Sequence, residues 1–161
     1  QSWANAVNSP FKKWKVQGME GGICTPLIAY WPAGIDLPRN SISREPCHLI
    51  DFLPTFMELA GDEANYPNDL PELDGISLKP TFSGKKLNRS DPLFFQYGSW
   101  QVIRQNQWKL VQRKEEPWQL YDLHNDRTET RDLASHFPQK VKMMQSRWTE
   151  MAKTLGVTVS H

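Results

Sequence analysis

One continuous stretch of the chain reads Lys15-Val16-Gln17-Gly18-Met19-Glu20-Gly21-Gly22-Ile23-Cys24-Thr25-Pro26-Leu27-Ile28-Ala29-Tyr30-Trp31-Pro32. The Gly21-Gly22 pair allows the backbone to adopt a positive φ or to approach another group closely. The run from Pro26 to Trp31 is short, apolar and followed by a proline, which is typical of a strand buried on both faces of a sheet. We therefore predict a buried strand over residues 23–31, preceded by a loop from which Lys15 can reach an anionic ligand.

A helix is predicted further along the chain, beginning at Asp51. Asp51 is suited to the N-cap, and Pro54 lies in the first turn, where a missing N–H costs little. Gly61 is placed to end the helix. The helix should have one apolar face, made of Leu53, Phe56, Met57 and Ala60.

From residue 92 onward the pattern changes to short β-prone runs at 93–97, 100–104, 108–112 and 118–123. Turn residues separate the runs at near-hairpin spacing, which predicts a four-stranded antiparallel sheet. Apolar residues then recur with helical period over residues 138–155, so we expect a helix laid across the sheet with Trp148 facing it. The basic residues between Arg104 and Lys114 are predicted to lie on the solvent faces of the strands.

Several of these motifs resemble type I sulfatases, the formylglycine-dependent, arylsulfatase-like enzymes of the alkaline phosphatase superfamily. Residues 15–32 are similar to the segment that follows the last metal-binding motif of that family. Residues 51–61 resemble its D-x-x-P-T-x-x-x-L-A-G helix, and residues 74–78 its D-G-x-S-L turn. Residues 104–134, with Trp108-Lys109-Leu110-Val111 and Leu120-Tyr121-Asp122-Leu123, resemble its C-terminal sheet. The resemblance covers nearly the whole chain.

The resemblance implies an α/β fold, namely the C-terminal part of the alkaline-phosphatase-like sulfatase fold. Residues 1–91 would be the C-terminal segment of the large α/β domain, and residues 92–161 a small subdomain of antiparallel sheet plus helix. The implied activity is hydrolysis of sulfate esters, with Lys15 contacting the sulfate group. Periplasmic, extracellular or lysosomal locations are typical of the family, and its substrates include sulfated small molecules and carbohydrates.

The nucleophile and metal that the resemblance implies have no motif in this chain. Sulfatases make formylglycine from Cys or Ser in a C/S-x-P/A-x-R motif, but Ile28 stands four residues after Cys24, where arginine is required. We therefore expect Cys24 to be a small buried core residue. The expected calcium needs several convergent oxygen ligands, and neither an Asp-Asp pair nor an Asp-Asn-Gly motif is present. Calcium and formylglycine are expected in a longer parent, whose N-terminal catalytic half is missing here.

Other residues in these motifs have simpler interpretations. Lys15 is one of three lysines close together, and the alternative to a sulfate contact is a solvated surface charge. Nothing in the sequence positions its neighbours Lys12 and Lys13. Glu20 is predicted to be structural, tying the loop to backbone or to a cation. His48 is predicted to be a packing residue that precedes the Asp51 helix.

Composition narrows the classes of partner. The net charge of +1 argues against nucleic acid as a binding partner. No apolar run has the length of a membrane span, so a membrane is not expected as a partner either. Cys24 and Cys47 could pair or remain free. Two alternatives to a sulfatase stay open: a phosphonate or phosphodiester hydrolase of the same superfamily, and a non-catalytic interaction or binding module.

Overall fold

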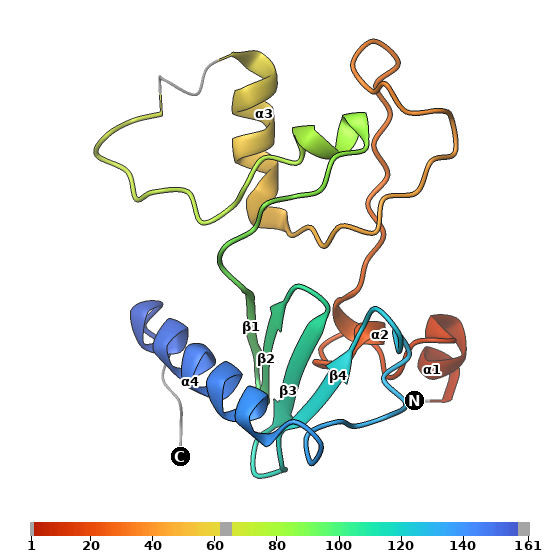
Figure 1. Cartoon of the computed structure of the whole chain (residues 1–161), viewed down its shortest axis with the longest axis vertical. Helices are drawn as coiled ribbons and strands as arrows, with labels where there is room; N and C mark the ends of the chain where they lie inside the picture. The colour runs from red at the N-terminus through yellow and green to blue at the C-terminus, as the bar shows by residue number, and fades with distance from the viewer. Residues whose placement is uncertain (1, 62–65, 158–161) are drawn as a thin grey trace. The chain divides into compact units, whose positions relative to one another are not determined.

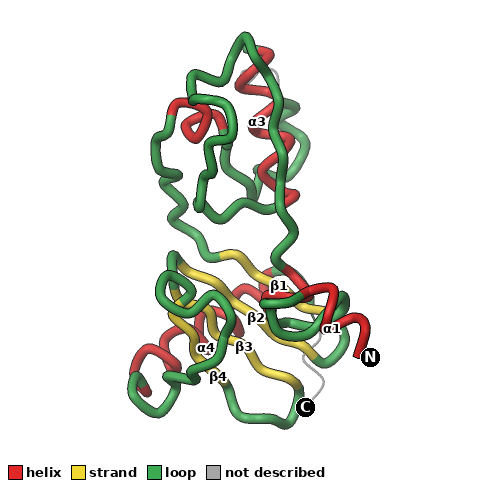
Figure 2. Tube along the Cα trace, turned by 90° about the vertical axis from the view of Figure 1, so that its right-hand side faces the viewer, coloured by secondary structure: helices red, strands yellow, loops and turns green. Residues whose placement is uncertain are grey.

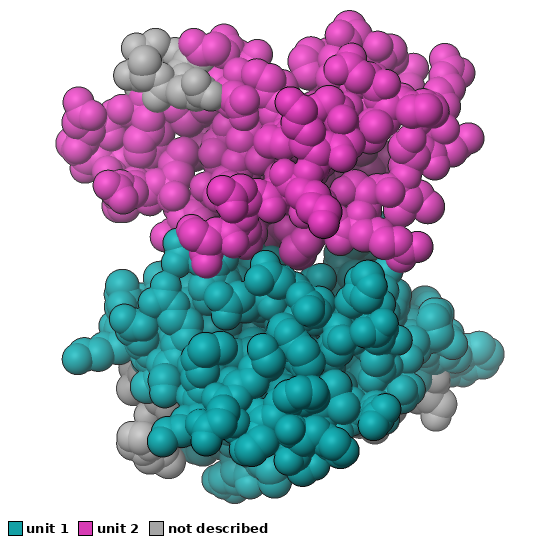
Figure 3. Space-filling view, viewed as in Figure 1, with its two compact units in different colours: residues 1–26, 91–161 teal, residues 27–90 magenta. Residues whose placement is uncertain are grey.

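The structure is a computed structural model that describes residues 2–61 and 66–157. Contacts between Cα atoms divide the chain into two compact units, shown in different colours in Figure 3. One unit contains residues 1–26 together with residues 91–161, and the other contains residues 27–90. The second unit therefore ends next to the predicted boundary at residue 91. The predicted division into a large domain and a subdomain concerns a longer parent, so it stays a prediction.

The first unit is built on four strands in one antiparallel sheet, with the order β1-β2-β3-β4 (Figures 1 and 2). The strands are β1 (Leu93–Tyr97), β2 (Trp100–Gln105), β3 (Trp108–Arg113) and β4 (Gln119–Asp122). Two-residue connections join the first three strands, and positive φ at Gly98 and Asn106 suits the twist of such hairpins. The predicted four-stranded sheet is confirmed.

One face of this sheet is covered by α4 (Pro138–Thr154), as predicted. Ile103, Leu110 and Leu120 on the strands pack against Met144, Trp148 and Ala152 of the helix. Trp148 is only 2% exposed and stacks on Phe94, with the ring centroids 5.3 Å apart. The period of apolar residues in the sequence therefore identified the helix and its buried face correctly.

The opposite face of the sheet is also covered, which the sequence analysis did not foresee. Met19 and the short α2 (Glu20–Ile23) lie against this face, and Figure 1 shows α2 and α4 on opposite sides of the strands. The core beneath them consists of Met19, Val102, Val111, Tyr121 and Leu123, with Ile23, Phe95 and Trp100 at its edge. Leu110 and Val111 are adjacent in β3 and both fully buried, because each side of the sheet has its own cover.

The predicted buried strand over residues 23–31 is wrong for this structure. Ile23 ends α2, and residues 24–31 form no strand. Leu27, Ile28 and Tyr30 are exposed, Ile28 by 88%. A strand requires a neighbour that pairs with its backbone N–H and C=O groups. None of the described residues pairs with this segment in the manner of a strand, although its composition suits burial.

The second unit is centred on the buried carboxylate of Asp51. It contains the 3₁₀ turns η1 (Leu49–Asp51) and η3 (Lys79–Ser83) and the helix α3 (Phe52–Ala60). Gly61 ends α3 with a φ of 71°, as predicted. Asp51 precedes α3, but its carboxylate caps η1 instead: it accepts the N–H of His48 at 2.7 Å, accepts the N–H of Ile76 and pairs with Arg89. The His48 side chain also caps this turn, since its Nδ1 accepts the N–H of Ile50 at 3.3 Å, so His48 is a structural residue, as expected.

The remaining helix, α1 (Ser2–Asn8), precedes the loop that contains Lys15. No helix within residues 2–61 and 66–157 is both long enough and apolar enough to span a membrane.

Candidate functional site

Lys15 lies in a loop whose two ends are tied together. The N–H of Gly21 donates to the carbonyl of Lys12 at 2.9 Å. The side-chain amide of Asn8 donates to the carbonyls of Lys13 and Gly21, at 3.1 Å each. The segment from Lys12 to Gly21 is therefore a closed loop rather than an open connection.

Close packing of the backbone explains the two adjacent glycines. A Cβ on Gly21 would collide with the carbonyl oxygens of Lys12 and Lys13. A Cβ on Gly22 would collide with the carbonyl of Gln17 and lie 2.6 Å from that of Trp14. Neither glycine has a positive φ. Of the two uses expected for this pair, close approach is the one that the structure requires.

Replacing Gly21 with alanine should therefore loosen the loop. We expect the free energy of unfolding to fall by about 1–3 kcal/mol, because an added methyl group in a closely packed site forces the backbone to shift. Urea denaturation of the chain measures this change. Gly98→Ala is a useful comparison: a Cβ there meets nothing within 4 Å, and the cost comes only from the positive φ. A Gly21→Ala chain as stable as the unsubstituted chain would contradict the close approach.

Lys15 lies in an exposed part of this loop. It sits in a turn that is closed by the N–H of Gln17 donating to the carbonyl of Trp14 at 3.2 Å. Val16, next to it, has a positive φ of 71°. Lys15 is exposed, and within the described residues it makes neither a hydrogen bond nor an ion pair. Its ammonium group is therefore available to an anion. The predicted sulfate contact stays a prediction.

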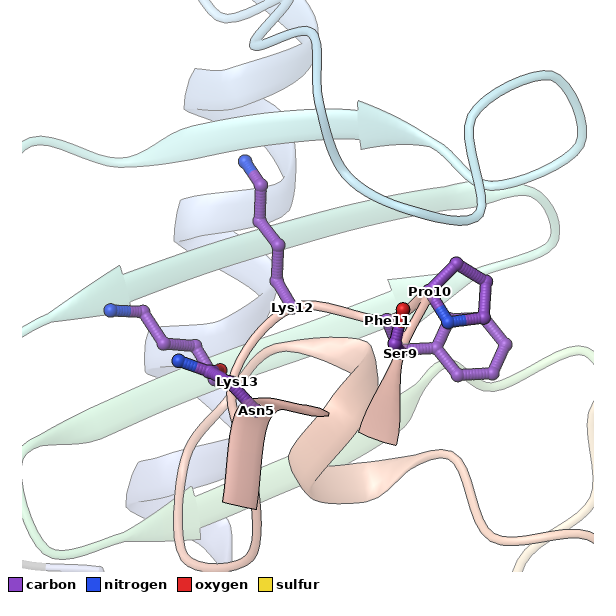
Figure 4. Close-up of a pocket in the computed structure, with 6 residues that line it drawn as sticks. All are labelled: Asn5, Ser9, Pro10, Phe11, Lys12 and Lys13. Atoms are coloured by element: carbon purple, nitrogen blue, oxygen red, sulfur yellow. The ribbon is translucent and has the colours of Figure 1, made fainter. Parts of the chain in front are cut away.

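The neighbouring lysines differ from Lys15 and from each other. Lys12 is held: its Nζ donates to the carbonyl of Glu129 and lies 5.8 Å from the centre of the Tyr121 ring. Lys13 is exposed, and its Nζ lies 5.9 Å from the Trp14 ring. Figure 4 shows the two side chains leaving the loop in different directions. The prediction that nothing positions Lys12 is therefore wrong.

The same close-up shows the residues around a shallow surface hollow: Asn5, Ser9, Pro10, Phe11, Lys12 and Lys13.

Three buried charged side chains lie where the loop meets the sheet. Lys109 of β3 is fully buried, and its Nζ is 2.9 Å from Oε1 of Glu20 and 2.7 Å from Oε1 of Glu129. Glu20 and Glu129 are 1% and 0% exposed. We call Glu20, Lys109 and Glu129 the buried triad. The prediction that Glu20 ties the loop to a cation is confirmed, and the cation is Lys109.

Glu129 has an unusual backbone and a perturbed carboxyl group. Its φ is 56°, in the left-handed region that few residues other than glycine adopt. A turn around Asp126 holds it there: the Asp126 carboxylate accepts the N–H groups of Thr130 at 3.0 Å and Arg131 at 2.8 Å. Burial raises the pKa of Glu129, and the nearby ammonium of Lys109 opposes that rise. The charge of Glu129 therefore depends on its pairing with Lys109.

The prediction of a solvent-facing Lys109 is wrong, because the sheet is covered on both sides. Lys109 projects to the same face as Val111 and is paired in register with Tyr121 of β4. The adjacent apolar pair Leu110-Val111 pointed to two buried faces, and that pattern also applies to Lys109. Glu129 belongs to the segment that resembles the family's C-terminal sheet, but no periodic pattern linked it to Glu20, because it lies in a polar loop far along the sequence.

Cys24 lies at the edge of the same region and is not a core residue, contrary to expectation. It is half-buried, and Nη2 of Arg127 is 3.4 Å from its Sγ. Burial, together with the nearby carboxylate of Glu20, raises the pKa of the Cys24 thiol. A raised pKa disfavours the reactive thiolate. No disulfide joins Cys24 and Cys47.

The calcium implied by the family resemblance has no matching ligand set in this part of the protein. Across residues 2–61 and 66–157, no three side chains of the His, Cys, Asp and Glu types come together as a metal site. The described residues therefore do not fit that ion.

Comparisons with known proteins agree over most of the chain. Residues 13–155 match a family described as "N-sulphoglucosamine sulphohydrolase, C-terminal". A sulfatase of Formosa agariphila is 32% identical over 149 residues, covering 83% of this chain and 27% of the relative. The choline-sulfatase of Rhizobium meliloti is 30% identical, covering 76% of this chain and 23% of the relative. The chain thus spans less than a third of the length of these relatives.

A solved structure has a similar fold. The crystal structure of Ps i-CgsB superposes with a TM-score of 0.67 and 25% identity, covering 87% of this chain and 32% of that one. The same protein has been solved in complex with k-i-k-neocarrahexaose, and that structure superposes equally well.

Proposed function

We propose that this chain, which belongs to the sulfatase family and has the fold of its C-terminal part, forms part of an enzyme hydrolysing sulfate esters. The residue that we assign to the reaction is Lys15, as a contact to the sulfate group. The observation that carries this assignment is the geometry of the loop. Lys15 is an exposed ammonium, unpaired within the described residues, on a backbone that is closed at Lys12 and Gly21 and held against a sheet.

The role of Lys15 would be electrostatic. Cleavage of a sulfate ester changes the charge on the sulfate and ester oxygens, and a cation fixed before the reaction stabilises that charge without having to reorganise. The formylglycine nucleophile and calcium of the family would come from the part of the enzyme outside this chain. What this chain supplies is a positioned positive charge and the scaffold that holds it.

The substrate class that we propose is a sulfated small molecule or carbohydrate. The relatives include a choline-sulfatase and an "Ulvan-active sulfatase" of Formosa agariphila. The solved complex of Ps i-CgsB contains an oligosaccharide. A single ammonium on a loop can bind the sulfate of either class, so the selection between them would rest on other parts of the enzyme.

The partner that we propose for this chain is the N-terminal catalytic half of the same enzyme. The chain covers 27% of the first relative. The second unit also leaves large apolar side chains exposed, among them Leu27, Ile28, Tyr30, Leu53 and Phe56. Exposed apolar residues in such number indicate a surface that another structure covers. Residues 1–91 would then join a large α/β domain, with residues 92–161 as its subdomain.

A comparison of substrates tests the proposed activity. A full-length enzyme that carries this chain should hydrolyse an aryl sulfate and prefer it to an aryl phosphonate or a phosphodiester. The isolated 161-residue chain should show only the background rate, because a nucleophile and its metal supply most of such a rate enhancement. A preference for the phosphonate or the phosphodiester would replace the proposal with the related hydrolase. Turnover by the isolated chain would contradict the division of roles.

A further inference from the structure

We propose that Glu129 is a positioning residue for Lys15, and this inference rests on the proposed sulfate contact. Glu129 binds both ends of the loop that displays Lys15. Its carbonyl oxygen accepts a hydrogen bond from Nζ of Lys12, where the loop begins. Its Oε2 accepts the backbone N–H of Glu20 at 2.7 Å, where the loop ends. One residue, 114 positions after Lys15, thus contacts both ends of the loop.

We call these two contacts of Glu129 the clamp. Lys109 and Glu20, the rest of the buried triad, make the clamp rigid. Lys109 pairs with the second oxygen of Glu129 and also with Glu20, so the loop end, the clamp and strand β3 share one ammonium. A carboxylate buried with a cation and a backbone donor has few other positions that satisfy its charge. The end of the loop is therefore held to the sheet by charge as well as by the packing of Met19.

The backbone at Glu129 allows a single residue to do both tasks. A left-handed φ is strained for a glutamate, and such strain persists only where surrounding contacts enforce it. The Asp126 carboxylate supplies that constraint through the N–H groups of Thr130 and Arg131. The side chain and the carbonyl of Glu129 can then reach Glu20 and Lys12 respectively.

The contrasting interpretation is that the triad only stabilises the fold. The two roles differ in how Glu129 and Lys15 combine. A positioning residue acts through Lys15, so its loss should have little further effect once Lys15 is gone. A stabilising residue affects the enzyme whether or not Lys15 is present. A double-mutant cycle separates the two roles.

The experiment measures kcat and KM for an aryl sulfate in a full-length enzyme that carries this chain. Glu129→Ala should lower kcat by about 10-fold when Lys15 is present, on the scale of coupling that acts through a shared backbone segment. It should change kcat less than about twofold in a Lys15→Ala background. Glu129→Gln keeps an oxygen that can accept the Glu20 N–H, so it should retain more activity than Glu129→Ala. Glu116→Ala is the matched control, because Glu116 is exposed and pairs only loosely with Arg113, at 3.7 Å.

Each outcome supports or overturns the inference. The inference is supported if kcat falls more in Glu129→Ala than in Glu129→Gln and if this loss disappears in the Lys15→Ala background. Equal losses in both backgrounds, or no loss in either variant, overturn it. If the alanine variant does not fold, the glutamine variant carries the same comparison.

A second measurement keeps this test separate from the proposed function. If Lys15→Ala alone leaves kcat unchanged, the sulfate contact is wrong whatever Glu129 does. The clamp itself is then tested by amide hydrogen exchange in the 161-residue chain. Replacing Glu129 with alanine should speed exchange at Glu20 and Gly21 by about 10-fold or more, since exchange reports local opening. Glu129→Gln should speed it less, because it keeps an acceptor for the Glu20 N–H. Unchanged exchange at both amides in the alanine variant would show that the Glu129 side chain does not hold the loop.

Discussion

Replacing Lys15 with alanine in a full-length enzyme that carries this chain should lower the turnover of a sulfate ester by about 100-fold or more, the scale of losing one preorganised charge donor. The physical reason is the closed loop: the backbone that carries the Lys15 ammonium is held before the substrate arrives, so the charge acts on the reacting oxygens with little reorganisation. Steady-state kinetics with an aryl sulfate measures the loss. We expect most of it in kcat, because the interaction strengthens as charge develops.

The structure also selects the control for this substitution. Lys13 is exposed and lies two residues away, so Lys13→Ala removes the same charge from the same loop. It should change kcat less than about twofold, the scale of losing an exposed surface charge. Lys12 is unsuitable as a control because it binds the carbonyl of Glu129. Equal effects of Lys13→Ala and Lys15→Ala would show that Lys15 is only another surface charge.

Replacing Trp148 with alanine should lower the free energy of unfolding by about 3–5 kcal/mol, as expected when a large buried aromatic side chain leaves a cavity. Trp148 is fixed between Phe94 and Trp118, with the Trp118 ring centroid 6.1 Å away. It joins α4 to the sheet through the core that includes Leu110 and Leu120. Chemical denaturation of the 161-residue chain measures the loss.

Two further substitutions on α4 and its core calibrate this result. Trp148→Phe should cost less, because it keeps an aromatic ring and removes an indole N–H that finds no hydrogen-bond partner within the described residues. Met143→Ala should stay within about 0.5 kcal/mol, because Met143 is 56% exposed and alanine favours a helix. If Trp148→Ala destabilises the chain no more than Met143→Ala, Trp148 does not anchor the core.

Local sequence patterns predicted the sheet, the C-terminal helix and the end of α3 at Gly61. These features depend on short-range properties: alternation along a strand, helical period, turn residues and the left-handed φ that glycine adopts readily. The same kind of reasoning placed Lys15 before a glycine pair that the backbone approaches closely. These parts of the fold and of the candidate site needed no knowledge of distant residues.

The tertiary structure decided the burial of Lys109, the clamp at Glu129 and the conformation of residues 24–31. Whether Lys109 faces solvent depends on what covers the second face of the sheet, and Met19 and α2, far away in the sequence, do so. Glu129 meets Glu20 only because the sheet brings a late polar turn beside the early loop. Residues 24–31 have the composition of a buried strand, but a strand forms only where another segment pairs with its backbone. In each case the outcome depends on long-range contacts, and these arise when the chain folds rather than from any local pattern.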